Sequence, residues 1–208
     1  MREDAQKVFT KVYETNAWDT GGETRDGAGS TMHYTSTIRS VLPDLLKKYN
    51  VKSFLDASCG EYTWMRNVDL GDIKYIGADI VEAKIEKLKK EFPDKTWMVL
   101  DITEDPLPDV DFWMCRDTIF HFPHEHVKKT FLNFLRSNIE YILISSHPYE
   151  DNKDIEWGDF NTISLLKPPF SFPEPIDVID DTGPGYHIKR DMFVYRRKDM
   201  KDFLYFKD

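Results

Sequence analysis

Apolar and polar stretches alternate through the middle of this chain in a way that predicts strands and helices in turn. Five short apolar runs predict buried strands, at residues 53–57, 74–79, 96–100, 110–115 and 141–145. Two sets of apolar residues recur at helical spacing between them, namely Val81, Ile85, Leu88 and Phe92, and then Val127, Phe131 and Leu135. A further helix is expected from Glu61 to Val68. This alternation predicts an α/β fold with a doubly wound, mostly parallel sheet.

The two ends of the chain break the alternation. Residues 1–50 are expected to be mostly helical around a loop at 19–30, with Pro43 as a kink or restart. Residues 147–175 hold five prolines and predict a long, lid-like loop. Strands at 176–180 and 192–196 follow, separated by a Gly-Pro-Gly turn. We therefore expect a Rossmann-like sheet of seven strands with a terminal antiparallel hairpin and an N-terminal helical extension.

The whole chain, 1–208, is expected to form a single domain. Its expected segments are an N-terminal helical and loop cap at 1–50, a ligand-binding core at 51–146, the lid-like loop at 147–175 and the terminal hairpin at 176–208.

Polar residues follow four of the predicted strands: Asp56, Asp79, Asp101 and the pair Arg116-Asp117. Ligands of parallel sheets bind beyond the carboxyl ends of the strands. The separation 79 − 56 = 23 residues suits an acid that binds ribose hydroxyls one βα unit later. The turn after Asp56 holds only Gly60, so it disfavours a pyrophosphate and favours S-adenosylmethionine. An ordinary βα turn, with Asp79 and Asp101 as helix caps, is the alternative.

Composition narrows the class of protein. The 28 basic and 37 acidic residues give a net charge of −9, which argues against a broad nucleic-acid surface. Arg190, Arg196, Arg197 and Lys198 could still form a local basic site. No apolar run approaches a membrane span, and the charged N-terminus does not resemble a signal peptide. Two cysteines without zinc spacing, Cys59 and Cys115, suit a reducing cytoplasm.

The motifs at the strand ends resemble a known family. They are Phe54-Leu55-Asp56-Ala57-Ser58-Cys59-Gly60, Tyr75-Ile76-Gly77-Ala78-Asp79-Ile80, Leu100-Asp101-Ile102 and Cys115-Arg116-Asp117-Thr118-Ile119-Phe120-His121-Phe122. Over about residues 50–197 the chain resembles class I S-adenosylmethionine-dependent methyltransferases, although Ala57-Ser58-Cys59 stands where that family is richer in glycine. The segments Gly21–Thr31 and Asn152–Phe170 resemble a subgroup from bacterial, phage and large-virus genomes, often found beside polysaccharide genes.

The resemblance implies a role for each cofactor residue. The backbone of Asp56, Ala57, Ser58, Cys59 and Gly60 would approach the amino-acid part of S-adenosylmethionine. Asp79 would accept hydrogen bonds from the ribose diol, and Ile80 would pack on the adenine. Asp101 would receive the adenine amino group, near the Ile102 amide. Arg116 would pair with the cofactor carboxylate or with Asp117. Trp64 could flank the cofactor, but one turn into a helix it more simply belongs to the core.

Methyl transfer to an alcohol also needs a base for the hydroxyl proton. His121 is the predicted base, and Asp117, four residues earlier, would orient it or contact the substrate. A packed histidine between Phe120 and Phe122 is the alternative. The histidines at 121, 124 and 126 fit no recognised zinc spacing. We predict no metal, although Asp117, Asp180 and Asp181 could hold magnesium.

Substrate recognition is expected in the loops, which usually carry it on a rigid scaffold. The candidates are Glu23, Arg25, His147, Asn152 and Asn161, unless these groups only satisfy loop backbone. Nearby aromatic residues favour a sugar. The predicted activity is O-methylation of a sugar or glycan hydroxyl. Methylation of another small molecule at a carboxylate or amine remains an alternative, as does an inactive cofactor-binding partner subunit. An oxidoreductase using NAD fits less well, and the oligomeric state stays open.

Overall fold

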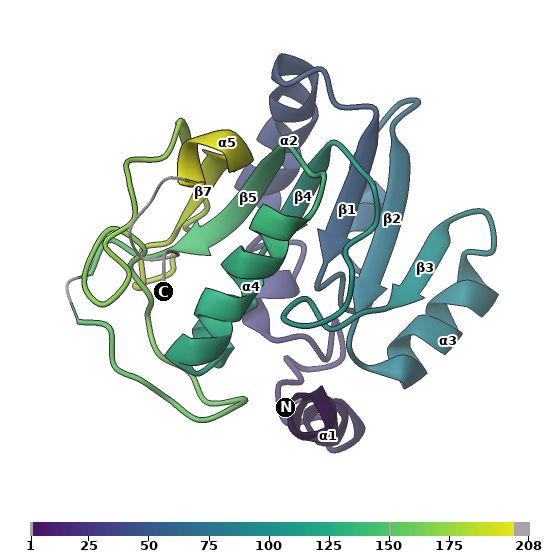
Figure 1. Cartoon of the computed structure of the whole chain (residues 1–208). Coiled ribbons are helices and arrows are strands. Elements are labelled where there is room, and N and C mark those ends of the chain that lie inside the picture. Colours follow the sequence, from purple (N-terminus) through teal and green to yellow (C-terminus); the bar gives the residue numbers. More distant parts are fainter. Residues whose placement is uncertain (1, 150, 202–208) are drawn as a thin grey trace.

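The computed structural model describes residues 2–149 and 151–201, and in it seven strands form one mixed sheet (Figure 1). The strands are β1 (Ser53–Ala57), β2 (Lys74–Asp79), β3 (Thr96–Val99), β4 (Phe112–Cys115), β5 (Tyr141–Ser146), β6 (Asp177–Asp180) and β7 (Asp191–Arg196). Their order is β3-β2-β1-β4-β5-β7-β6. The first five strands pair in parallel, and β7 is antiparallel to both β5 and β6. The predicted α/β fold is confirmed, including its terminal hairpin.

Helices cover both faces and the carboxyl edge of this sheet. They are α1 (Arg2–Glu14), α2 (Ser36–Lys48), α3 (Glu82–Glu91), α4 (His124–Arg136) and the short α5 (Arg197–Met200). Short 3-10 turns lie at Ala28–Ser30, Met65–Asn67 and Ile119–His121. Figure 1 shows α4 in front of the sheet, α2 behind it and α1 beyond the ends of β1 and β2.

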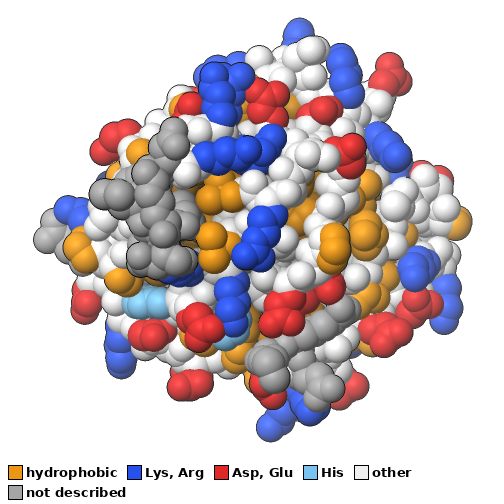
Figure 2. All heavy atoms as spheres, viewed as in Figure 1, with side chains coloured by type: hydrophobic (Ala, Val, Ile, Leu, Met, Phe, Trp, Pro, Cys, Tyr) orange, Lys and Arg blue, Asp and Glu red, His pale blue; other side chains and the backbone are white. Residues whose placement is uncertain are grey.

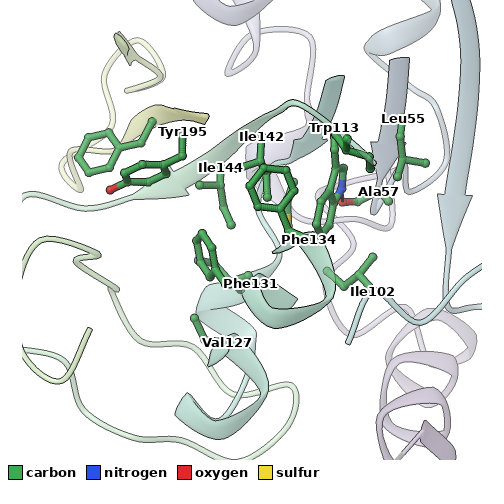
Figure 3. Packing of buried hydrophobic residues seen from close by; sticks show 14 of the residues in the cluster. Leu55, Ala57, Ile102, Trp113, Val127, Phe131, Phe134, Ile142, Ile144 and Tyr195 are labelled. Carbon is green, nitrogen blue, oxygen red and sulfur yellow. Dashed lines mark hydrogen bonds between the residues drawn. The ribbon is translucent and has the colours of Figure 1, made fainter. Parts of the chain in front are cut away.

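Two apolar clusters flank the sheet because successive side chains of a strand point to opposite faces. Leu55, Trp113 and Ile142 pack against α4, whereas their neighbours Phe54, Phe112 and Leu143 pack on the side of α2 and α3. Figure 3 shows Val127, Phe131 and Phe134 of α4 directed at the sheet, with Phe134 beside the indole of Trp113 at a centroid distance of 6.3 Å. That indole donates a hydrogen bond of 3.1 Å to the carbonyl of Ala57, which ties β4 to β1.

The structure corrects two local details of the prediction. The segment Glu61–Val68 contains a 3-10 turn in place of a helix, because Tyr62 has a positive φ of 60° that a helix cannot accommodate. Pro43 does not restart the chain in a second element, since α2 runs through it from Ser36 to Lys48, and the expected kink stays a prediction. The end of the expected hairpin segment, residues 202–208, lies outside the described residues.

The direction of the strands decides which loops meet at the site. β6 runs parallel to β5, because both are antiparallel to β7. The connection 181–190 between β6 and β7 therefore lies at the same edge of the sheet as the ends of β1 to β5. Loops that are far apart in sequence meet there.

Candidate active site

A cavity at the carboxyl edge of the sheet collects the residues expected to bind the cofactor. Every one of them except Ala57 lines it, together with α1 and the loop that follows α1. The lining cofactor residues are Asp56, Ser58, Cys59, Gly60, Asp79, Ile80, Asp101, Ile102 and Arg116. Ala57 is fully buried in the apolar cluster beneath α4. We call this space the first cavity.

The turn after β1 forms the floor of the first cavity. Gly60 adopts a positive φ of 56°, and a Cβ there would collide with the carboxylate of Asp26. The Cys59 amide donates to the Ala78 carbonyl at 2.8 Å, and the hydroxyls of Ser58 and Thr118 lie 2.8 Å apart. Only glycine fits this close approach of the N-terminal loop.

Asp79 stands at the end of β2, nearly fully buried. Its carboxylate accepts hydrogen bonds from the Val81 amide at 2.9 Å and the Gly60 amide at 3.2 Å. Burial raises the pKa of Asp79, and the ammonium of Lys84, 3.6 Å away, opposes that shift. A carboxylate has about four lone-pair positions, so the bonds from these two amides leave capacity for the two hydroxyls of a ribose. The N-cap residue of α3 is Val81, so the helix-cap alternative is wrong for Asp79.

Asp101 has one carboxylate oxygen in use and one without a partner. Oδ1 accepts from the amide and the hydroxyl of Thr103, at 2.9 and 2.7 Å. Oδ2 is buried and has no hydrogen-bond partner among the described residues. A buried acceptor without a partner costs free energy unless a ligand satisfies it. Asp101 lines the first cavity, and an acceptor of this kind has the chemistry to bind the exocyclic amino group of an adenine.

Asp56 and Trp64 complete the inner wall. Burial raises the pKa of Asp56 to about 7, even though its carboxyl accepts a hydrogen bond of 2.8 Å from Tyr75. Trp64 is buried and also lines the cavity, with the guanidinium of Arg116 5.2 Å from its ring centroid.

An ionic contact that the sequence did not reveal holds the N-terminal loop over the first cavity. The ammonium of Lys84, on α3, lies 2.5 Å from Oδ1 of Asp26, and both side chains are largely buried. Oδ2 of Asp26 accepts the Glu61 amide at 2.5 Å, and the Glu61 carboxylate accepts the Arg25 amide at 3.0 Å. The loop thereby rests on the turn after β1. Helix α1 precedes this loop in the chain, and its Gln6 donates to the Ile80 carbonyl at 3.2 Å.

A second cavity adjoins the first. Four residues line both cavities: Trp18, Asp26, Asp117 and His121. Most of the remaining lining of the second cavity comes from loops, including Tyr34, His147, Phe160, Tyr186 and Arg190. Phe160 and Tyr186 are 51% and 45% exposed, so these two aromatic rings remain accessible to a ligand. A reaction between ligands in the two cavities would take place beside Asp117 and His121.

His121 has a defined tautomer. Its Nδ1 lies 2.8 Å from the backbone carbonyl of Asp159. A carbonyl can only accept, so Nδ1 carries the proton and Nε2 keeps a lone pair. The ring stacks on Trp18 with centroids 4.5 Å apart, and burial lowers the pKa of His121 to about 4. The imidazole is therefore neutral near pH 7.

The expected orienting contact from Asp117 to His121 is replaced by two others. His121 sits in a 3-10 turn and is held by Asp159, while Asp117 has a positive φ of 55° and pairs with Arg190 and Arg116. The two side chains do not share a helix face, because no α-helix runs through residues 117–121. Both nevertheless line the boundary between the cavities.

Only part of the predicted substrate set reaches a cavity. His147 lines the second cavity, and Arg25 lines the first, where its guanidinium lies 5.0 Å from the ring centroid of Tyr13. Glu23, Asn152 and Asn161 line neither. Their side chains bond backbone groups of their own loops, for example Asn152 with Ser164 and Asn161 with Thr162. For these three, the loop-backbone alternative describes the contacts in the structure.

The remaining charged candidates have protein partners. Asp181, considered above for magnesium, lies between two arginines, which is an unfavourable place for a cation. Among the described residues no group of three or more His, Cys, Asp or Glu side chains is arranged to hold a metal. Arg190 is buried, Arg196 pairs with Glu140, and Arg197 bonds the Ile139 carbonyl. Basic and acidic side chains are interspersed over the face that Figure 2 shows.

Comparison with known proteins assigns the fold to one class. No protein-family profile matches the sequence, and no curated protein matches it. Solved structures match over most of the chain, at identities that establish only the fold. This fold is that of class I S-adenosylmethionine-dependent methyltransferases.

Three of the matching structures illustrate the likeness. A methyltransferase from Leishmania major has a TM-score of 0.66 at 14% identity, covering 93% of this chain and 82% of its own. Magnesium protoporphyrin IX methyltransferase from Synechocystis, with bound S-adenosylhomocysteine, has a TM-score of 0.64 at 12% identity, covering 94% and 99%. The N-methyltransferase NodS from Bradyrhizobium japonicum, also with S-adenosylhomocysteine, has 0.64 at 11%, covering 89% and 97%. Two of the three hold the demethylated cofactor, which supports S-adenosylmethionine as the cofactor of this fold. Within residues 2–149 and 151–201, no helix has the length and hydropathy to cross a bilayer.

Proposed function

We propose that the protein is an S-adenosylmethionine-dependent methyltransferase that methylates a hydroxyl of a sugar or glycan. The observation that carries this proposal is the pair of adjoining cavities, with His121 and Asp117 lining both. The first cavity suits the cofactor and the second the acceptor. Bound S-adenosylmethionine would supply an electrophilic methyl group on a sulfonium sulfur.

The residues of the first cavity have the chemistry that the cofactor requires. Asp79 would accept the ribose hydroxyls, and the unpaired Oδ2 of Asp101 would accept the adenine amino group. Ile80 would pack on the adenine ring, and the backbone from Asp56 to Gly60 would adjoin the methionine portion. The expected metal-free mechanism is retained as a prediction.

His121 has the protonation state of a general base. Its Nδ1–H is committed to the Asp159 carbonyl, so Nε2 is the atom that can take a proton. The hydroxyl of a bound acceptor would give its proton to Nε2 of His121 as it is methylated, and the resulting imidazolium would release that proton to solvent. The depressed pKa keeps the imidazole of His121 neutral at pH 7.

The charges around the second cavity favour an uncharged acceptor. Asp117 is paired with Arg190, and Asp26 with Lys84, while burial lowers the pKa of both His121 and His147 to about 4. A carboxylate or an ammonium would therefore meet no free counter-charge among these groups. A sugar offers hydroxyls for the polar groups and a ring face for aromatic side chains such as Phe160 and Tyr186.

Calorimetric titration with S-adenosylmethionine, S-adenosylhomocysteine and NAD tests the cofactor. Release of S-adenosylhomocysteine is then followed with methyl glycosides of glucose, mannose, galactose, rhamnose and fucose. Glucuronic acid and glucosamine serve as charged controls. We expect binding of the first two cofactors alone and turnover with neutral sugars. Binding of NAD alone would contradict the class, turnover with the charged controls alone would contradict the acceptor, and binding without any turnover would favour the inactive partner subunit.

A further inference from the structure

We propose that Asp181, on the terminal hairpin, is a positioning residue that fixes the carboxylate of Asp117 between the two cavities through Arg116 and Arg190. The inference rests on the proposed function, because it assigns Asp117 to the place where acceptor and cofactor meet. Neither the family motifs nor the sequence pattern assigns such a role to the hairpin.

The four side chains form a closed, buried ring of alternating charges. Asp181 is 0% exposed, and its Oδ2 accepts Nε of Arg116 at 2.9 Å and lies 2.6 Å from Nη2 of Arg190. Oδ1 of Asp181 accepts Nη2 of Arg116 at 3.3 Å. Each arginine then reaches Asp117, Arg116 through Nη1 at 3.3 Å and Arg190 through its own Nη1. Asp181 thus contacts both guanidinium groups, and each of these groups in turn contacts Asp117.

Asp181 itself is set apart from the ligands. It lines neither cavity, whereas Arg116 lines the first, Arg190 the second and Asp117 both. Asp181 can therefore influence a bound acceptor only through the arginines. This separation makes its role one of positioning, and it makes the residue a clean target for mutation.

The surrounding chain is shaped to accept the ring of charges. The Gly29 carbonyl accepts Nη1 of Arg116 at 2.8 Å, and a Cβ on Gly29 would collide with Oδ2 of Asp117. Both guanidinium groups lie over the ring of Tyr34, at 4.8 Å for Arg190 and 5.8 Å for Arg116. The hairpin also packs closely against Tyr34, because a Cβ on Gly183 would collide with the Tyr34 ring. The N-terminal loop, the loop after β4 and the hairpin are therefore fixed to one another here.

Removing the carboxylate charge of Asp181 would leave two positive charges and one negative charge in the ring. Two guanidinium groups would then share the single carboxylate of Asp117. In a buried site their like charges repel strongly, because ions from the solvent cannot enter freely to screen them. Asp117 would be drawn between them and away from the acceptor. A displacement of about 1 Å in a catalytic constellation can lower turnover about 100-fold.

The test compares Asp181→Asn with Asp180→Asn. Asp180 is the matched control, because it is adjacent in the chain but exposed, and its carboxylate only accepts the Thr182 amide at 2.8 Å. Each variant is measured for affinity for S-adenosylhomocysteine by calorimetry, for kcat and KM with the methyl glycosides above, and by crystallography. We expect Asp181→Asn to lower kcat at least about 10-fold, with cofactor affinity within about threefold and the Asp117 carboxylate displaced. We expect Asp180→Asn to match the wild type.

A folded Asp181→Asn variant with wild-type kcat and an unmoved Asp117 carboxylate would overturn the inference. Should that variant fail to fold, Arg190→Lys takes its place, since it keeps the charge but cannot bridge two carboxylates as a planar fork. It is expected to lower kcat in the same way, and a wild-type kcat would again overturn the inference. Failure of the wild type to bind S-adenosylhomocysteine would contradict the proposed function instead. The position of Asp117 in the variant would still decide the positioning role.

Discussion

Exchange of Asp101 for asparagine would test the assignment of the adenine-binding acid most directly. Oδ1 of Asp101 is held by the amide and hydroxyl of Thr103, so the neutral side chain can keep the same orientation. Its amide nitrogen would then occupy the place of the unpaired Oδ2. A donor would face the donor amino group of adenine where an acceptor stood before.

The expected loss follows from the strength of one hydrogen bond to a charged group. Such bonds contribute about 1.5–3 kcal/mol, and about 1.4 kcal/mol corresponds to tenfold in affinity. Asp101→Asn should therefore weaken S-adenosylhomocysteine binding by about 10- to 100-fold. The free energy of unfolding should change little, because Oδ2 has no protein partner among the described residues.

A chemical control distinguishes this contact from general damage. S-inosylhomocysteine carries an oxygen in place of the adenine amino group, so it should bind the variant better than it binds the wild type. Calorimetry with both ligands, and thermal unfolding of both proteins, complete the assay. Equal affinity of the two proteins for S-adenosylhomocysteine, with no gain for the inosine analogue, would refute the assignment of Asp101.

Three further predictions concern the base, the metal and the core. His121→Ala should lower kcat at least about 100-fold at nearly unchanged S-adenosylhomocysteine affinity, whereas the exposed His187→Ala should match the wild type; wild-type turnover would exclude His121 as the base. Since the neutral imidazole is the active form and its pKa is about 4, wild-type turnover should be level from pH 6 to 8 and fall only toward pH 4. A chelator should leave turnover unchanged, and a loss restored by magnesium would contradict a metal-free mechanism. Phe131→Ala should lower the free energy of unfolding in urea by about 3–5 kcal/mol, because Phe131 is fully buried between α4 and the sheet; a loss below about 1 kcal/mol would contradict that packing.

Burial of titratable side chains makes the folding stability depend on pH. In the folded protein burial lowers the pKa of His147 to about 4, below its ordinary value near 6.5. Between those two values the unfolded chain binds the proton and the folded chain does not. The contribution of His147 to stability is therefore complete above about pH 6.5 and is lost as the pH falls through 4. Buried Asp56, whose pKa is raised to about 7, acts in the opposite direction as the pH rises.

The strands could be predicted from the sequence because a strand buried on both faces is a continuous apolar run. β1 and β2 were predicted at their observed bounds on this ground alone. The false helix from Glu61 shows where such local reasoning ends. The conformation of Tyr62 accompanies the packing of its ring against Tyr75, Phe92 and Trp97, at centroid distances of 5.0–5.3 Å. These partners are distant in the chain, so no local sequence pattern around Tyr62 indicates that they pack against its ring.

The candidate site also has a part that could be predicted from the sequence and a part that could not. Asp79 and Asp101 could be predicted because the ends of parallel strands must meet at one edge, whatever the loops do. The contact between Asp26 and Lys84 joins residues 58 apart in the sequence, and the ring around Asp181 joins the loops that follow β4 and β6. The only sequence feature that indicated these contacts was the polar, glycine-containing stretch at 19–30. It directed attention to the right loop, but to Glu23 and Arg25 ahead of Asp26.

The two cavities also differ in what builds them, and this explains why the acceptor is harder to infer than the cofactor. The first cavity takes its polar groups largely from strand ends, whose positions the sheet dictates. Much of the second takes its walls from elements outside that alternation, with Trp18 and Tyr34 in the N-terminal segment, Phe160 in the loop after β5 and Tyr186 in the hairpin. Substitutions at Phe160 and Tyr186 should change acceptor selectivity without touching Asp79 or Asp101, whereas Trp18 also stacks on His121 and Tyr34 lies against Arg116 and Arg190. Changes at Asp117 or Arg190 would instead disturb the buried charges at the boundary between the two cavities. Substitutions in the exposed loop walls should therefore alter acceptor selectivity, and substitutions among these charged residues should alter turnover.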